Sequence, residues 1–439
     1  MMRRLAFLLA LLLGAPALAA TPPLPLTEGT TAVVHPAWAR SANIYEVNIR
    51  QYTPEGTFRA FEKHLPRLRR MGVKILWIMP VSPISKKMRK GTLGSYYAVS
   101  DYTAINPEFG TLADFTHLVA TAHRLGFKVI LDWVANHTGW DHVWVTQHPE
   151  WYIRNAAGEL EGYRYTDLSD GHQEVWADVI GLDYSKPAVR AGMIAAMRWW
   201  VRTAGIDGFR CDVAWTLPTT FWEEARATLD AIKPMFMLAE ADTPEMHSRA
   251  FNMTYDWTLK NVLVNVAKGE ADARDLAKLY TAPARRYPAG AYRMTFTSNH
   301  DENSWKGSDR ELYGDAADAM TVLAATLPGM PLIYSGQEAD LDKRLAFFEK
   351  DQIDWGTYHR APLYAKLLAL KRRHPALTSA MVPGNLELIE TGNAKVFAFR
   401  RIAGRDRVTV VVNLSPALAT VTLSRSKTIA LAGWGWSIR

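Results

Sequence analysis

Four apolar runs of strand length in this chain of 439 residues each end on a carboxylate, which suggests chemistry built on acids. The four acids are Asp132, Asp212, Glu240 and Asp301. Parallel strands closed into a barrel converge at their C-terminal ends, where side chains distant in the sequence meet around one cavity. A single acid after a strand often caps the next helix, but four of them favour one shared active site.

Segments of strand length and helix length alternate from about residue 44 onward, a pattern typical of βα units around a parallel sheet. The expected strands cover residues 44–48, 75–80, 128–132, 207–212, 235–240, 252–256, 293–298 and 331–335, with helices at 57–71, 112–125, 187–203 and 362–373. Eight such strands predict a closed TIM (β/α)8 barrel of the α/β class.

Two stretches break this alternation and predict further domains. Residues 137–182 contain no clean βα unit and are too long for an ordinary connection, so we expect an inserted subdomain after strand 3. Later, short alternating segments predict a C-terminal all-β domain, in which Trp434 and Trp436 are expected to seal the contact with the barrel rather than bind a polymer. The predicted order is a signal peptide at 1–20, barrel at 21–137, insert at 138–185, barrel at 186–375 and a C-terminal β-sandwich at 376–439.

The first residues have the features of a secretory signal peptide. Arg3 and Arg4 precede an apolar stretch at 5–13, and an A-x-A cleavage signal follows at 17–19. The stretch is shorter than the ~20 residues that a membrane-spanning helix needs. We therefore expect an exported protein, periplasmic or secreted, with no membrane span in the mature chain.

Charge and cysteine content narrow the class of partners. The formal net charge of +7 includes the leader arginines, and the one dense basic stretch, residues 86–90, is expected to be a solvated loop. A nucleic-acid partner is therefore not expected. Cys211 is the only cysteine, so no internal disulfide can form, and we expect it to be an inert thiol packed in the barrel wall.

With the elements placed, the sequence resembles the α-amylase family of retaining glycoside hydrolases over nearly the whole mature chain. Residues 132–138, 208–212 and 299–301 are similar to the family's segments at strands three, four and seven, and Glu240 stands where the strand-five acid is found. Further similarities lie at 96–102 and 181–184. An ordered set on predicted strand ends is far more specific than any single motif.

The resemblance implies two carboxylates that cleave a glycosidic bond with retention, one attacking the anomeric carbon and the other protonating the leaving oxygen. It makes Asp212 the nucleophile, Glu240 the acid/base and Asp301 a ligand of the sugar hydroxyls. Arg210 shares a strand face with Asp212, and its charge is expected to keep that carboxylate ionised. The apolar run at 235–239 is expected to favour the protonated form of Glu240.

By the same resemblance, the expected substrate-binding residues are Tyr97, His137, Arg210, His300 and Trp305. Tyr97, rather than its neighbour Tyr96, would stack under the sugar at the cleavage point. The two histidines would hydrogen-bond that sugar, and the tryptophan is the expected outer sugar contact.

The chain departs from the family pattern in one motif. Many calcium-dependent members carry a Lys-His pair after the nucleophile, whereas residues 213–216 here read Val-Ala-Trp-Thr. Asn136 matches another usual calcium ligand, and acids of the insert at 167, 170 or 178 could add oxygen ligands. No cofactor is required for the chemistry, and a structural calcium ion stays open.

These features predict an exported hydrolase of α-1,4-glucosidic bonds, acting on an α-glucan or maltooligosaccharide in the manner of an α-amylase. The alternatives are a cyclomaltodextrinase, an oligosaccharide α-glucosidase, a transglycosylase of the same family, and a non-catalytic sugar-binding relative. The intact set of Asp212, Glu240 and Asp301 argues against the last of these. Polymer or short substrate, endo or exo action and oligomeric state stay open.

Overall fold

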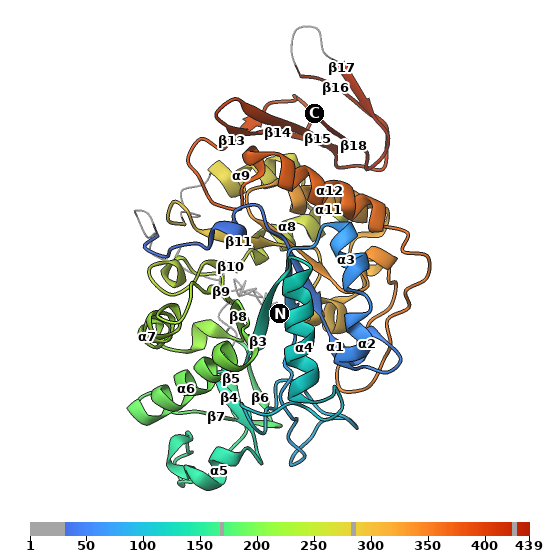
Figure 1. Ribbon diagram of the computed structural model, residues 1–439. Coiled ribbons are helices and arrows are strands. Elements are labelled where there is room, and N and C mark those ends of the chain that lie inside the picture. The colour runs from blue at the N-terminus through green and yellow to red at the C-terminus, as the bar shows by residue number, and fades with distance from the viewer. Residues whose placement is uncertain (1–30, 167–170, 282–286, 424–427) are drawn as a thin grey trace, which may run out of the picture.

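The computed structural model describes residues 31–166, 171–281, 287–423 and 428–439, and its centre is a closed barrel of eight parallel strands (Figure 1). Around the ring the order is β1–β12–β11–β10–β9–β8–β3–β2. The strands are β1 (Ile44–Val47), β2 (Ile75–Ile78), β3 (Lys128–Trp133), β8 (Gly208–Cys211), β9 (Phe236–Ala239), β10 (Met253–Tyr255), β11 (Tyr292–Thr295) and β12 (Met330–Tyr334). Each coincides with an expected strand, and the predicted TIM barrel is confirmed. The predicted signal peptide lies outside the described residues.

Helices surround the barrel. The larger ones are α4 (Leu112–Arg124), α6 (Pro187–Ala204), α7 (Thr219–Asp230), α8 (Trp257–Ala267), α9 (Ala273–Thr281), α11 (Ala317–Thr326) and α12 (Ala361–Arg373). The single helix expected at 57–71 is wrong, because the structure has two, α2 (Phe58–Glu62) and α3 (Leu65–Met71). Pro66 has no N–H to donate to the carbonyl of Glu62, so it is accommodated in the first turn of a new helix.

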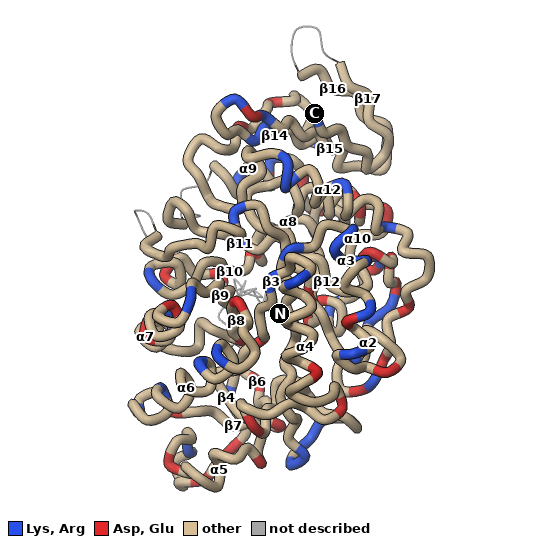
Figure 2. Tube along the Cα trace, viewed as in Figure 1, with Lys and Arg blue, Asp and Glu red and all other residues tan. Residues whose placement is uncertain are grey.

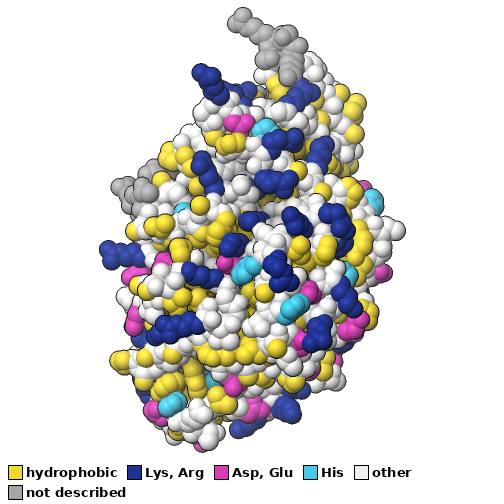
Figure 3. Space-filling model, in the orientation of Figure 1, with side chains coloured by type: hydrophobic (Ala, Val, Ile, Leu, Met, Phe, Trp, Pro, Cys, Tyr) yellow, Lys and Arg dark blue, Asp and Glu magenta, His cyan; other side chains and the backbone are white. Residues whose placement is uncertain are grey.

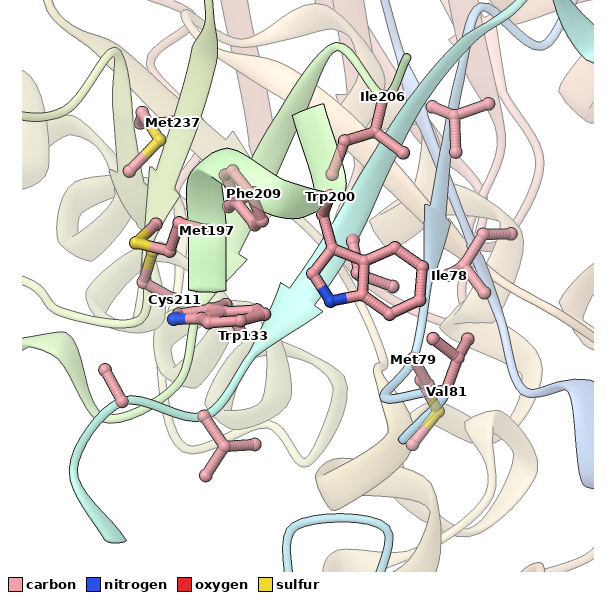
Figure 4. Close-up of a cluster of buried hydrophobic side chains, with 14 of the residues drawn as sticks. Ile78, Met79, Val81, Trp133, Met197, Trp200, Ile206, Phe209, Cys211 and Met237 are labelled. Atoms are coloured by element: carbon pink, nitrogen blue, oxygen red, sulfur yellow. The ribbon is translucent and has the colours of Figure 1, made fainter. Parts of the chain in front are cut away.

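The barrel wall near the site is held by packing between α6 and the strands β3 and β8. Figure 4 shows Trp200 and Met197 of the helix beside Trp133, Phe209 and Cys211 of the strands, and all five side chains are buried. Complete burial of one such side chain contributes about 1.5–3 kcal/mol. Because side chains alternate along a strand, Phe209 and Cys211 face the helix while Arg210 faces the barrel interior. Cys211 is the packed thiol that was expected, and burial raises its pKa well above the ordinary value.

The insert after β3 lies at the C-terminal ends of the barrel strands (Figure 1). It contains two small antiparallel ladders, β4 (His137–Gly139) with β7 (Val179–Gly181), and β5 (Tyr163–Thr166) with β6 (Gln173–Trp176). The short helix α5 (Val143–Gln147) lies between them in the sequence. Aromatic pairs hold the second ladder, since the rings of Tyr165 and Trp176 stack 4.6 Å apart.

The C-terminal strands lie at the end of the molecule away from the insert (Figure 1). One sheet has the order β13 (Leu386–Ile389), β14 (Val396–Ala403), β15 (Asp406–Asn413), β18 (Trp436–Ile438), and β16 (Ala419–Thr422) pairs with β17 (Thr428–Leu431). Apolar side chains of β14 and β15 share a core with α11, and Trp434 and Trp436 pack against that core, as expected of residues that seal the contact. The all-β class of this region is confirmed.

Charged side chains of both signs are interspersed along the chain (Figure 2). On the face drawn in Figure 3, Lys and Arg side chains are spread among neutral and hydrophobic ones instead of forming one stripe. Within the described residues, none of the helices combines the length and the apolar character needed to cross a membrane.

Candidate active site

A cavity of about 740 Å³ opens at the C-terminal ends of the barrel strands, between the insert and the connections that follow β2, β11 and β12. Seven of the sequence-predicted site residues line it: Tyr97, His137, Asp212, Glu240, His300, Asp301 and Trp305. Arg210 and Asn136 do not reach the cavity surface. The barrel thus brings together residues that span more than 200 positions of the sequence.

Arg210 lies beneath the cavity floor and contacts three carboxylates. Its side chain has no exposed surface. Its Nη1 donates to Asp132 Oδ1 at 2.9 Å and to Asp212 Oδ1 at 3.0 Å. Its Nη2 lies 2.8 Å from Glu240 Oε2. The Nε donates to the hydroxyl of Tyr255 at 3.0 Å. A guanidinium is planar and always charged, so it holds these acids in a defined arrangement.

Asp212 and Glu240 are brought together by a close approach of strand β8 to strand β9. A Cβ atom on Gly208 would lie 1.8 Å from the carbonyl oxygen of Phe236 on the neighbouring strand, so only glycine fits there. Asp212 follows the end of β8, and Glu240 follows the end of β9. The close strand pair therefore sets the spacing of the two carboxylates.

The pKa of Asp212 is raised, whereas its neighbour Arg210 alone would lower it. Burial, together with the nearby carboxylate of Glu240, raises the pKa of Asp212 well above its ordinary value, although Arg210 opposes the shift. Arg210 thus acts in the expected direction, toward the ionised carboxylate, but burial and the like charge of Glu240 outweigh it in the pKa of Asp212.

Glu240 has polar contacts in place of the apolar surroundings that were expected. Its Oε2 accepts a hydrogen bond of 2.7 Å from the backbone N–H of Val213 and contacts Arg210. Val213 has φ 35° and ψ 45°, a left-handed conformation that β-branched residues rarely adopt. Strain of this kind costs of order 1–3 kcal/mol and persists where the surrounding structure imposes it. Here the strained backbone directs an N–H onto Glu240.

His300 connects the cavity to a buried acid that the sequence analysis missed. Its Nδ1 pairs with Glu46 Oε1 of β1 at 2.5 Å, and its Nε2 lies 2.8 Å from the hydroxyl of Tyr97 and 3.3 Å from Asp301 Oδ2. Burial would lower the pKa of His300, but Asp301 and Glu46 outweigh burial and raise it well above the ordinary value. Burial raises the pKa of Glu46. His300 is therefore an imidazolium held between two acids.

Asp301 is more accessible than Asp212 and Glu240, with 43% of its side chain exposed against 10% and 11%. Burial alone would raise its pKa, but the neighbouring His300 holds the pKa of this carboxyl below its ordinary value. An exposed and ionised carboxylate is suited to accept hydrogen bonds from hydroxyl groups of a ligand.

The structure separates the two neighbouring tyrosines. Tyr97 lines the cavity, donates to Asp132 Oδ2 at 3.1 Å, and stacks on the ring of His300 at 5.5 Å between centroids. Tyr96 lies outside the cavity lining, fully packed under Arg50. Of the two rings, only that of Tyr97 is placed to contact a ligand.

The remaining predicted contacts lie on opposite sides of the cavity. His137 of β4 is buried, and burial lowers its pKa to about 4, so it is neutral near pH 7. Trp305, in the helical turn Glu302–Lys306, is 52% exposed and lies beside Phe347, with ring centroids 5.3 Å apart. A large exposed aromatic ring at a cavity rim is suited to stack on a sugar.

The described residues do not fit the calcium site that Asn136 suggested. Its Oδ1 accepts a hydrogen bond from the hydroxyl of Thr216 at 3.0 Å, and Asp178 is paired with Lys90 at 2.8 Å. Residues 167 and 170 lie outside the described ranges. Calcium takes six to eight oxygen ligands, and within the described part of the chain no group of three or more His, Cys, Asp or Glu side chains gathers around a possible metal position.

Three residues of the site network escaped the sequence analysis. Glu46 is a charged residue inside an otherwise apolar strand, a signal that could have revealed it. Tyr255, the partner of Arg210, is an ordinary strand tyrosine that carries no such signal. Lys90 belongs to the basic stretch expected to be a solvated loop. That expectation is wrong for this residue, because Lys90 lines the cavity and pairs with Asp178.

Comparison with known proteins identifies the family. The family model described as "Alpha amylase, catalytic domain" matches residues 35–355, most of the chain. The chain therefore belongs to the alpha-amylase family.

Three relatives illustrate the range of the family. The chain is 27% identical over 407 residues to alpha-amylase MalA of Haloarcula japonica, covering 88% of this chain and 57% of that protein. It is 28% identical over 434 residues to alpha-1,4-glucan:maltose-1-phosphate maltosyltransferase 2 of Streptomyces coelicolor, covering 90% and 61%. The chain thus spans less than two thirds of these two relatives. A crystal structure of maltogenic alpha-amylase AmyB from Thermotoga neapolitana matches with a TM-score of 0.77 and 30% identity, covering 91% of this chain and 96% of that one.

The charge on His300 should depend on Glu46. In Glu46→Gln, a change that keeps the side-chain size, the pKa of His300 should fall because one of its two acidic neighbours is lost while burial remains. Histidine NMR titration measures this shift directly. His137, whose pKa is about 4, serves as an internal control that should not move. An unchanged titration of His300 in the folded variant would contradict the role given to Glu46.

Proposed function

We propose that this chain is an exported retaining glycoside hydrolase that cleaves α-1,4-glucosidic bonds of starch-type glucans, in the manner of an α-amylase. The observation that carries the proposal is the contact of Asp212 and Glu240 with two nitrogens of one buried guanidinium at the cavity floor. This arrangement favours the short separation of about 5–5.5 Å used by retaining enzymes over the wider spacing that leaves room for a water between the acids.

In the first step Asp212 is the nucleophile. A carboxylate oxygen attacks the anomeric carbon while the glycosidic C–O bond breaks, and Glu240 gives its proton to the leaving oxygen. The products are a glycosyl ester on Asp212 and a free sugar chain. Arg210 contacts Asp212, so its positive charge stabilises the ionised form of this carboxylate, which attacks the anomeric carbon.

In the second step Glu240, now ionised, takes a proton from an incoming water. The water oxygen bonds to the anomeric carbon, and the ester bond to Asp212 breaks, which restores the enzyme. Asp301 and His300 are placed to hold the hydroxyl groups of the sugar, and Tyr97 is placed to stack under its ring. The positive charge of the protonated His300 ring would strengthen its hydrogen bonds to the sugar.

A second candidate function is glycosyl transfer to a sugar in place of water. The maltosyltransferase among the relatives supports this possibility. The missing Lys-His pair after Asp212 instead bears on the substrate, since enzymes that act on short maltooligosaccharides or cyclodextrins often lack it. A cyclomaltodextrinase or oligosaccharide α-glucosidase remains the alternative among hydrolases. We also propose that the protein is exported and acts in a periplasm or outside the cell, because residues 1–20 have the features of a secretory signal peptide.

A time course of products from soluble starch and maltoheptaose tests the proposal. Both should yield shorter α-1,4 oligosaccharides whose new reducing ends first appear as the α-anomer in proton NMR. A chelator should leave the rate unchanged, because Asn136 and Asp178 are engaged with protein partners. Release of the β-anomer would contradict the retaining assignment. Transfer products longer than the substrate would favour glycosyl transfer. Loss of activity on chelation would show that the reaction needs a metal ion and would contradict this prediction.

Asp212→Asn should abolish turnover, by about 10⁴-fold or more, while sugar binding is largely retained, because an amide is too weak a nucleophile to form the ester. Turnover of maltoheptaose and its binding, measured by calorimetry, separate the two effects. Unchanged turnover would contradict the assignment of Asp212.

Glu240→Gln is the matched control for this variant, because it removes the acid and not the nucleophile. Substrates with poor leaving groups should lose about 10²–10⁴-fold in rate, whereas an activated aryl glycoside, which needs little protonation, should lose far less. Equal losses on both kinds of substrate would mean that Glu240 is not the acid.

The acid limb of the pH profile should lie above the range of an ordinary aspartate. Catalysis needs Asp212 ionised, and its pKa is raised by burial and Glu240. As the pH falls through this raised pKa, Asp212 becomes protonated and kcat/KM should drop by about tenfold per pH unit. Full activity retained down to about pH 4, near the unperturbed value for aspartate, would contradict this account.

A further inference from the structure

We infer that the cavity is walled on its glycone side, so that the enzyme removes short units from the non-reducing ends of glucan chains and does not cut inside them. The glycone is the part of the substrate that bears the attacked anomeric carbon. The inference rests on the proposed function, because it uses the roles of Asp212 and Glu240 to orient the substrate.

The orientation follows from the barrel order. Glu240 protonates the leaving oxygen, so the departing part of the chain lies toward β9. The order β1–β12–β11–β10–β9–β8–β3–β2 puts β9 directly across the ring from β1. The glycone therefore points toward β1 and its neighbours β2 and β12.

The connections that follow β2 and β12 are hydrogen-bonded to each other on this side. The backbone N–H of Leu93 donates to the carbonyl of Phe348 at 3.0 Å, and the N–H of Thr92 donates to Glu349 Oε1 at 2.9 Å. The hydroxyl of Thr92 also bonds to Glu349. Phe348 lines the cavity, so these bonds stand directly behind its surface.

The insert completes the wall at one end. Lys90, in the connection after β2, pairs with Asp178 just before β7, with nitrogen and oxygen 2.8 Å apart. Both residues line the cavity, and the carboxylate side chain is only 7% exposed. The ammonium group of Lys90 also lies 5.9 Å from the ring centre of Phe348. This ion pair closes the gap between the insert and the loop.

The turn after β11 completes the wall at the other end. The backbone N–H of Leu345 donates to Asn303 Oδ1 at 2.9 Å, and the hydroxyl of Ser304 donates to the carbonyl of Leu345 at 2.9 Å. Trp305 and Phe347 then pack side by side over the same stretch. Bonded segments thus run without interruption from the insert to the β11 turn.

On the opposite side, the described residues form no such wall along the cavity. Among the described residues that line the cavity, none lies between Glu240 and His300 in the sequence. The connection after β10 is a single residue, Asp256, before α8 begins at Trp257. A leaving chain of any length can therefore extend over β9 and β10. The whole cavity, about 740 Å³, is the size of a cleft that holds one small molecule, so the part on the glycone side has room for a short oligosaccharide only.

The test compares two maltoheptaosides with the same chromogenic leaving group, one with a free non-reducing end and one with that end blocked by an ethylidene acetal. The wild-type enzyme should cleave the free substrate with one dominant short product and the blocked substrate at least about tenfold more slowly. Cleavage of both at rates within about twofold, with a spread of product lengths, would overturn the inference and leave the proposed function intact. Cleavage of neither by the folded enzyme would overturn the proposed function as well.

Lys90→Ala should weaken the wall, because it removes the bridge to the insert. The ratio of blocked to free cleavage should rise several-fold in this variant. Lys86→Ala is the matched control, since this lysine belongs to the same loop, is exposed, and does not line the cavity. An unchanged ratio in a folded and active Lys90→Ala enzyme, or an equal rise in both variants, would overturn the role of the bridge.

Discussion

The contacts of Arg210 are the interaction on which the site depends. One fully buried guanidinium contacts Asp132, Asp212 and Glu240, and its Nε donates to the hydroxyl of Tyr255. A buried cation without partners would be costly, and removing one member of a buried ion pair typically costs 3–5 kcal/mol. The acids and the arginine therefore require one another, and the barrel interior is built to hold all of them at the level of the cavity floor.

This cluster explains how one cavity supports two carboxylates with different tasks. Arg210 alone does not set the charge on Asp212, because burial and Glu240 act against it and raise its pKa. The strained backbone of Val213 adds a directed hydrogen bond to Glu240, so conformational strain is stored at the acid and not distributed over the loop.

A second charged chain, from Glu46 through His300 to Asp301, crosses the barrel on the other side of the cavity. It places a positive charge beneath the sugar position and an exposed carboxylate beside it. The outer loops are joined to each other by backbone hydrogen bonds, and the Lys90–Asp178 pair links the insert to them at the cavity lining. In the proposed function, chemistry and substrate length are controlled by separate parts of the molecule.

Much of this protein is determined by sequence patterns that act locally. The alternation of strand and helix segments, the acids at strand ends and the two-residue spacing of Arg210 and Asp212 all depend on short-range periodicity, so the barrel and seven of the cavity residues could be predicted. The break between α2 and α3 could also have been predicted from Pro66 in the local sequence, although the sequence analysis missed it. What only the tertiary structure decided are interactions between distant segments: Glu46 with His300, Arg210 with Glu240 as well as Asp212, Lys90 with Asp178, and the bonded wall between the connections after β2 and β12. A pKa or a cavity rim depends on which distant groups end up within a few ångströms of one another, and a single sequence without its fold carries no record of those distances.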